Sequence, residues 1–284
     1  MKHDSVVKQA PFELEAPTDD KPFMEHFYRL RSLFSKQMRE EAVQPFWAAA
    51  GLVTFTTGEA IYSDLSVYVI LLEAILLSTI FIIYPLMKMK RAGVTVRGAG
   101  HLLVYFFCLG VGFIFVEICF IQKYILFIGY PVYAVAAILS SLLVAAGLGS
   151  YCTSRWNKNP FLILRMVVCA ILVIILIQIF LMPLLFRQFL SAPFEMRMLL
   201  SILFIFPCGF FMGMPFPIGL SWTARHYRNF VPWAWGINGY ATVIGSVLSV
   251  ILALHFGFRV VLFIAAGIYV IAYLSLSSAK TPAA

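Results

Sequence analysis

The stretch FPCGFFMGMPFPIGL, residues 206–220, is apolar enough to cross a membrane but carries residues that interrupt a helix. Each proline removes a backbone N–H donor and clashes with the carbonyl four residues earlier. In hydrocarbon a carbonyl freed in this way must find another partner, because no water is present. We therefore predict a broken helix, about which the other helices gather. The residues of the predicted break are Pro207, Gly209, Gly213, Pro215 and Pro217.

Two interpretations of this break are open. It is either a discontinuous helix at a binding site, as in many transporters, or a kinked helix that only packs against its neighbours. The next stretch, VPWAWGINGYATVIGS at residues 231–246, has Pro232 at a helix start, where a missing donor costs nothing. Asn238 then lies one to two turns inside the membrane. We expect Asn238, or a side chain of another helix, to cap one of the freed carbonyls.

The composition of the whole chain is that of an integral membrane protein. Of its 284 residues, 62% are hydrophobic and 12% are charged, whereas a soluble domain has about 25% charged residues. The net charge of +8 is an orientation signal, because basic residues continue into the loops beside lipid phosphates. No basic groove with interleaved aromatic residues indicates nucleic-acid binding. The five cysteines show no CxxC pattern, so neither a metal site nor a cofactor is predicted.

The predicted fold class is all-α, a polytopic helix bundle of seven or eight spans at residues 65–277. Each clear apolar segment is near the roughly 20 residues that a bilayer requires. The seven predicted spans are Leu65–Met87, Gly100–Ile121, Pro131–Ser150, Phe161–Phe186, Met196–Leu220, Trp233–His255 and Arg259–Leu276.

The sequence before the first clear span divides into two parts. Residues 1–45 are expected to form a polar tail and then an amphipathic helix, on the membrane surface or against a partner domain. Residues 46–64 are expected to form a marginal or interfacial segment. After the last span, residues 278–284 are expected to form a short tail. The apolar residues of the amphipathic helix recur at helical spacing: Phe23, Phe27, Leu30, Phe34 and Met38.

The orientation of the bundle depends on the number of spans. Basic residues concentrate in one set of alternate loops, which the positive-inside rule places in the cytoplasm. With seven spans the basic N-terminal region would lie outside. An eighth crossing through residues 46–64 would bring it back to the cytoplasm, and both arrangements are open.

Polar residues within the spans form a candidate intramembrane site. A carboxylate at membrane depth is costly when it is ionised and unpaired, so it is a candidate functional group. Glu117 lies two turns from Gly110 on the same helix face. In the alternative interpretation, Glu117 is near the end of its predicted span and reaches interfacial water or Lys123. The candidate residues are Glu73, Glu117, Gln122 and Asn238.

Glu73 is deeper in its predicted span and is expected to be protonated, or paired with Asn238 or Gln178. The pairs Gly209-xxx-Gly213 and Gly236-xx-Gly239 are interpreted as small-residue surfaces for close helix contact. No Ser-His-Asp set, HExxH motif or useful pair of acids is present, so no catalytic residue is predicted.

Several long signatures occur in order along the chain and together resemble one family. That family is the bacterial membrane-bound spermidine synthase-like proteins, in which major-facilitator-like helices are fused to a spermidine synthase fold. The resemblance extends from about Ala16 to the end of the chain. The signatures are APTDDKPF (16–23), RGAGHLLVYFFCLGVGFIFVEICFIQKYILFIGYPVYAV (97–135), AAGLGS (145–150), PCGFFMGMPFPIGL (207–220) and VPWAWGINGYATVIGSVLS (231–249).

The resemblance implies a function as well as a location. In the family, a domain similar to aminopropyltransferases and methyltransferases precedes the TDDxPF-like segment, so this chain is expected to lack it and not to be an enzyme by itself. We expect a multi-pass protein of the bacterial inner membrane, major-facilitator-like in part, that anchors or cooperates with a separately encoded synthase-like or methyltransferase-like domain. The alternative is part of a transporter for a small, cationic solute such as a polyamine, which would need a partner or a homo-oligomer.

Overall fold

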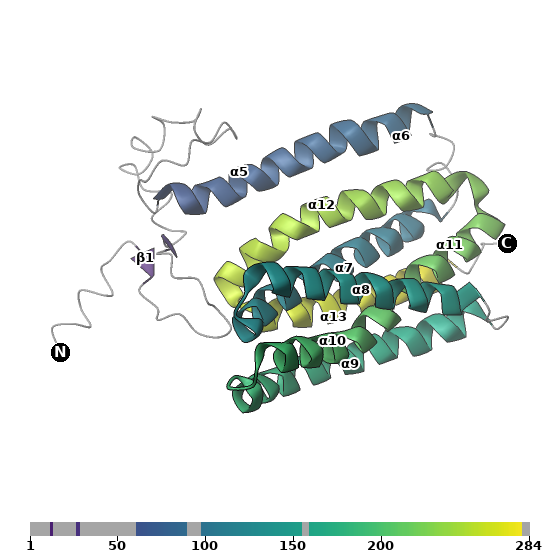
Figure 1. Ribbon diagram of the computed structural model, residues 1–284. Helices are drawn as coiled ribbons and strands as arrows, with labels where there is room; N and C mark the ends of the chain where they lie inside the picture. The colour runs from purple at the N-terminus through teal and green to yellow at the C-terminus, as the bar shows by residue number, and fades with distance from the viewer. Residues whose placement is uncertain (1–11, 14–26, 29–60, 90–97, 155–158, 280–284) are drawn as a thin grey trace, which may run out of the picture. The chain divides into compact units, whose positions relative to one another are not determined.

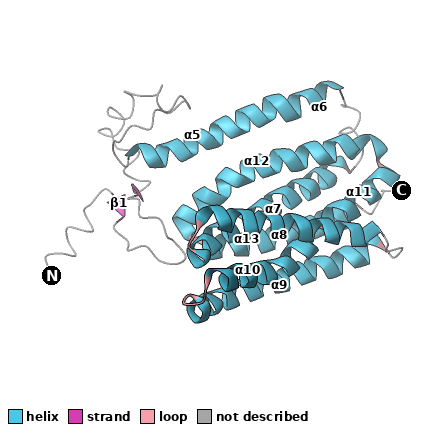
Figure 2. Cartoon of the chain, viewed as in Figure 1, coloured by secondary structure: helices cyan, strands magenta, loops and turns pink. Residues whose placement is uncertain are grey.

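The computed structural model describes residues 12–13, 27–28, 61–89, 98–154 and 159–279. Within these ranges the chain is helical almost throughout, as Figure 2 shows. It divides into two compact units, Met1–Leu76 and Leu77–Ala284, and each is described by itself. The all-α class is therefore confirmed for the described part of the chain, apart from two very short strands.

The first unit contains these strands and most of helix α5 (Ile61–Ser78). Strands β1 (Phe12–Glu13) and β2 (Phe27–Tyr28) pair in antiparallel register, with Phe12 opposite Tyr28. At Phe27 and Tyr28 the prediction of an amphipathic helix is wrong, because these residues are extended and paired. The rest of that prediction lies outside the described residues, as does most of the segment 46–64 and of the tail 278–284.

Seven helices of the described chain are long and apolar enough to cross a membrane, as predicted. The first span, Val67–Lys88, includes the end of α5, a π-helical turn η1 (Thr79–Ile83) and α6 (Tyr84–Met89). Helices α10 (Phe194–Met212) and α11 (Pro215–His226) together form one span, Phe194–His226. The other five spans are formed by α7 (Ala99–Ile128), α8 (Pro131–Ser154), α9 (Pro160–Phe189), α12 (Val231–Phe256) and α13 (Phe258–Ser278).

Helix α7 is the centre of the second unit. It is the most buried of the seven spans and packs against α8, α10, α11, α12 and α13, and Figure 1 shows it beside α12. The prediction that the helices gather about the proline-rich span is therefore wrong. Two glycines of α7 give the physical reason, because they allow close approach: Gly110 lies against α12, and Gly112 lies against Tyr269 of α13.

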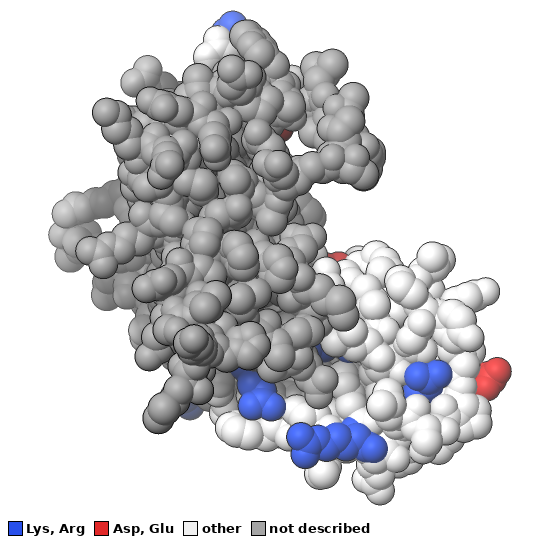
Figure 3. Space-filling view, turned by 90° about the vertical axis from the view of Figure 1, so that its left-hand side faces the viewer, with Lys and Arg blue, Asp and Glu red and all other residues white. Residues whose placement is uncertain are grey.

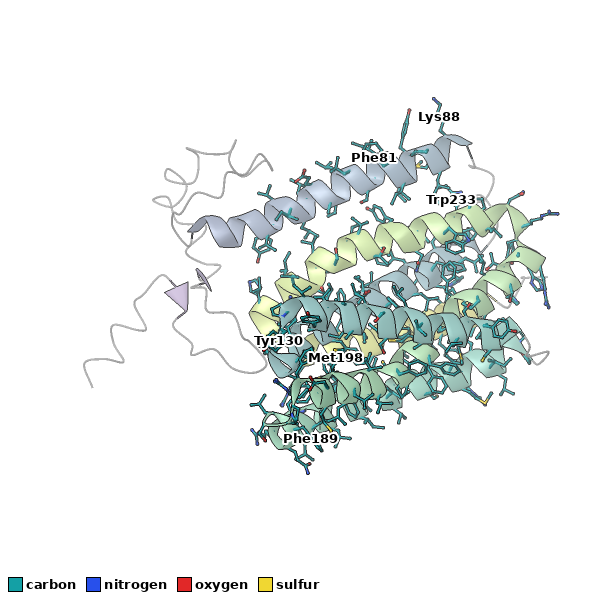
Figure 4. All side chains as sticks on the ribbon, viewed as in Figure 1. Phe81, Lys88, Tyr130, Phe189, Met198 and Trp233 are labelled. Atoms are coloured by element: carbon teal, nitrogen blue, oxygen red, sulfur yellow. The ribbon has the colours of Figure 1, made fainter. Side chains whose placement is uncertain are left out.

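Short turns join the helices into antiparallel pairs. Gly129 ends α7 at φ 82° and Gly257 ends α12 at φ 82°, a conformation that glycine adopts without strain. Asn159 caps α9, since its side chain accepts a hydrogen bond from the Phe161 N–H at 3.1 Å. Tyr130 and Phe189 thus lie at one end of the second unit, while Lys88 and Trp233 lie at the other (Figure 4).

The described basic residues fall into two groups, one at each end of the second unit. Figure 3 looks toward the end where α7 meets α8, and shows Lys and Arg groups on a mostly neutral surface. This separation agrees with the predicted alternation of the loops, and which end faces the cytoplasm stays a prediction. At the end where α7 meets α8 lie Arg187, Arg197 and Arg259. At the opposite end lie Lys88, Arg225 and Arg228.

Helices α8 and α10 approach through small residues. A Cβ atom on Gly149 of α8 would collide with the Phe210 carbonyl, and one on Gly213 would collide with the backbone of Ala146. A Cβ atom on Gly209 would lie 3.0 Å from the Ala145 Cβ. The prediction that Gly209 and Gly213 form a close-contact surface is confirmed.

In the second predicted pair of glycines, Gly236 and Gly239, the close helix contact is confirmed at Gly236 only. A Cβ atom on Gly236 would collide with Leu86 of α6, so this glycine lies in a helix contact. Gly239 has nothing within 4 Å of the position of its missing Cβ.

Candidate functional site

The predicted helix break is present, between α10 and α11. Helix α10 ends at Met212 and α11 begins at Pro215. The Phe211 carbonyl, which cannot bond to Pro215, accepts a hydrogen bond from the Met214 N–H at 3.2 Å. A tighter local turn thus replaces the lost helical bond, with no side chain needed.

The three prolines differ in their effect. Only Pro215 coincides with the break, where it starts α11. Pro217 lies in the first turn of α11, where backbone N–H groups have no helical partner in any case. Pro207 lies inside α10, which continues past it to Met212. The functional role of this break stays a prediction.

Asn238 does not cap the broken helix, so that part of the prediction is wrong. Its Nδ2 atom donates to the Phe106 carbonyl of α7 at 3.1 Å. The physical reason is the close approach of α12 to α7, where a Cβ atom on Gly110 would lie only 2.6 Å from the Asn238 carbonyl oxygen. Asn238 therefore joins α12 to the central helix.

A tyrosine that the sequence reading missed makes the contact with the start of α11. The hydroxyl of Tyr105, a fully buried residue of α7, donates to the Pro215 carbonyl. The ring lies against Gly219, where a Cβ atom would collide with it. Gly219 lies four residues after Pro215 on one face of α11, and this spacing was the available signal for a close neighbour.

Gln178 joins three helices in the interior of the second unit. The Tyr124 hydroxyl of α7 donates to its Oε1 at 3.4 Å, and its Nε2 donates to the Phe204 carbonyl of α10 at 2.6 Å. Gln178 is 1% exposed. The described hydrogen bonds of Gln178 and Asn238 thus go to groups of the second unit. Glu73 is exposed and belongs to the first unit, so its predicted pairing stays untested.

Glu117 lies further from the end of its helix than the predicted span placed it. The predicted span ended at Ile121, but α7 continues to Ile128, eleven residues beyond Glu117 and about 16 Å along the axis. Lys123, which the sequence suggested as the end of the span, is buried inside α7. Gln122 is also helical and partly exposed. Both interpretations of Glu117, as a deep carboxylate and as an interfacial one, stay predictions.

Arg197 of α10 is a second residue that the sequence reading missed. One terminal guanidinium nitrogen donates to the Phe127 carbonyl in the last turn of α7 at 2.8 Å. A cation at this end favours the helix dipole. The Nε atom of Arg197 is buried with no hydrogen-bond partner in the part of the chain that the structure describes.

An aromatic cluster lies at the same end of the second unit. Tyr130, Tyr133 and Phe194 meet edge to face, with ring centroids 5.3 to 6.3 Å apart. Figure 4 shows Tyr130 at this end. Such a cluster is typical of the membrane–water interface.

Within the described residues, no group of three or more His, Cys, Asp and Glu side chains could hold a metal ion. No family model matches the chain, and no curated protein and no solved structure matches it. The class of the protein therefore follows from its own fold, a helical protein with seven described helices that are long and apolar enough to cross a membrane.

Proposed function

We propose that the chain is a non-enzymatic membrane module that anchors or cooperates with a spermidine synthase-like or methyltransferase-like domain encoded separately. The proposal includes a location in the bacterial inner membrane and a partly major-facilitator-like arrangement of helices. The sequence signatures described above suggest the partner.

The observation that carries the proposal is the use of the polar groups inside the second unit. Asn238, Gln178 and Tyr105 each donate to a backbone carbonyl of another helix. Such bonds stabilise helix association by about 0.6–2 kcal/mol each. An interior whose polar groups hold helices together favours a stable module over an open path for solute.

The partner domain is proposed to dock on the segment Pro22–Met38, which is rich in basic and aromatic residues. The segment combines Arg29, Arg31, Lys36 and Arg39 nearby with phenylalanines, so it suits a surface that carries both acidic and apolar groups. This docking role is argued from the sequence alone.

Co-purification tests the proposal. The tagged full chain is isolated in mild detergent from its native membrane, and the proteins that remain bound are identified by mass spectrometry. We expect a synthase-like or methyltransferase-like protein in near-equal amount, and its loss from the variant Arg29→Glu/Arg31→Glu. The matched control Arg225→Glu/Arg228→Glu changes the charge equally at the α11–α12 corner and should keep the partner. Absence of any such protein from the wild-type preparation would contradict the proposal.

A second candidate is part of a transporter for a cationic solute such as a polyamine. Two observations favour it, the break between α10 and α11 within the segment that is apolar enough to cross a membrane and the position of Glu117 far from either end of α7. Uptake of radiolabelled spermidine into proteoliposomes tests it. The double variant Glu73→Gln/Glu117→Gln should abolish uptake, whereas Glu195→Gln, at the exposed start of α10, should not. Uptake that the double variant leaves unchanged would sink this candidate.

A further inference from the structure

The carboxyl group of Glu117 lies close to the middle of the central helix. Helix α7 extends from Ala99 to Ile128, and Glu117 is about 5 Å from its midpoint. The hydrocarbon core of a bilayer is about 30 Å thick, so a residue in the middle of a spanning helix is far from either water interface. A carboxyl group at this depth is costly when charged and alone.

The contacts between α7 and α12 define the register of the two helices. Gly110 of α7 meets Asn238 and Ala241 of α12, and one turn later Ile114 meets Gly245, with the Ile114 Cγ2 atom 2.6 Å from the position of a Cβ. Residue numbers rise together along both helices, which run in the same direction beside each other (Figure 1).

One further turn along this contact brings Glu117 of α7 to the level of Ser249 of α12. Ser249 is fully buried, and its hydroxyl donates to the Ser246 carbonyl of its own helix at 2.8 Å. Glu117 is partly buried. The register therefore places Glu117 on the face of α7 that meets α12, at the level of the small hydroxyl residue Ser249.

Glu117 makes no hydrogen bond or ion pair with any described residue. Charged or titratable groups lie on α7 itself and on the helices that pack against it. On α8, Tyr133 and Tyr151 lie near the two ends, and on α11 the basic residues lie at the opposite half of α7. The nearest groups by position are Cys119, Lys123 and Tyr124 on α7, Cys208 on α10, His255 on α12, and Arg259 and Tyr269 on α13.

We propose that Glu117 is a proton-binding site at the interface of α7 and α12, which takes up and releases a proton within the membrane. The ligand is a proton, because the neighbours that the register provides are one hydroxyl and apolar side chains, too few oxygen atoms to coordinate a metal cation. The proposal concerns this carboxyl group alone and is independent of the partner domain and of solute transport.

Labelling with dicyclohexylcarbodiimide tests the proposal on the full chain in membrane vesicles. This apolar reagent adds to a protonated carboxyl group, and the adduct rearranges to a stable N-acylurea without any other reactant. We expect the peptide that contains Glu117 to be labelled at low pH, and the labelled fraction to fall progressively as the pH is raised. A water-soluble carbodiimide should label the exposed Glu195 but not Glu117.

Peptide mapping of the wild-type chain gives the answer without a variant, so the test does not depend on the folding of a mutant. The near-isosteric Glu117→Gln adds a control, since it should remove the label at this site and leave that at Glu195. Absence of label on Glu117 at every pH, label that does not change with pH, or equal reaction with the water-soluble reagent would each overturn the proposal.

Discussion

The α8–α10 and α7–α12 contacts use the same means of close approach but differ in the side chains beside it. Between α8 and α10, Gly149 and Gly213 bring the two backbones together. Between α7 and α12, the glycine contact at Gly110 is flanked by Asn238, and Glu117 lies two turns further along α7. We therefore interpret the α8–α10 contact as helix packing, and the α7–α12 contact, which has a carboxyl group near it, as a candidate site.

The largest effect is expected at the α8–α10 contact, from Gly149→Ala or Gly213→Ala. Each added Cβ would collide with a backbone carbonyl, which cannot move aside as a flexible side chain could. We expect a loss of about 3 kcal/mol or more in the free energy of unfolding, measured by denaturant titration in detergent or bicelles. Gly147→Ala is the matched control on α8, because nothing lies within 4 Å of its missing Cβ. Equal stability of Gly149→Ala and Gly147→Ala would break the comparison.

Gly110→Ala should destabilise the α7–α12 contact by about 1–3 kcal/mol. Its Cβ would lie 2.6 Å from the Asn238 carbonyl oxygen and 2.8 Å from the Ala241 Cβ, so α12 must shift outward. The same titration measures the loss, with Gly239→Ala as the control in open space on α12. If the two variants unfold alike, α12 does not approach α7 at Gly110.

Asn238→Ala should reduce the free energy of unfolding by about 1 kcal/mol, the usual size of a polar contact between membrane helices. The variant loses the hydrogen bond to the Phe106 carbonyl and adds no bulk. Thr242→Ala is the control, because the Thr242 hydroxyl bonds only to the Gly239 carbonyl of its own helix. A larger loss in the control would mean that the bond between α7 and α12 is not the one that matters.

The smallest effect is expected from Tyr105→Phe, at about 0.5–1 kcal/mol. The ring keeps its packing on Gly219, and only the hydrogen bond to the Pro215 carbonyl is lost. Tyr133→Phe serves as the exposed control. Thermal unfolding followed by circular dichroism should rank Tyr105→Phe below Tyr133→Phe in stability, and the opposite order would contradict the contact.

Local pattern was enough to predict the spans and the break. Long apolar segments defined the seven spans, and the prolines and glycines from Pro207 to Pro217 predicted the interruption, because both depend on the backbone of one segment. Of the three prolines, only Pro215 coincides with the break. The close contact at Gly209 and Gly213 was also predictable from the residues themselves, since small side chains leave room for a neighbour.

The identity of each neighbour was not predictable in the same way. Which helix lies beside Asn238 or Gln178 depends on pairings between distant segments, and those leave no periodic signal in either one. The position of Glu117 relative to the end of its helix was misjudged for a different reason. Gln122 and Lys123 resemble the end of a span, but the helix continues to Ile128 and Lys123 is buried.

Disulfide crosslinking tests the central claim most directly, that Glu117 lies at the α7–α12 interface at the level of Ser249. The pair Glu117→Cys with Ser249→Cys should crosslink readily under mild oxidation, because facing positions bring the Cβ atoms near the roughly 3.8 Å that a disulfide requires. The pair Gln122→Cys with Ser249→Cys, on another face of α7, should not. Crosslinking of the second pair and not the first would contradict the account.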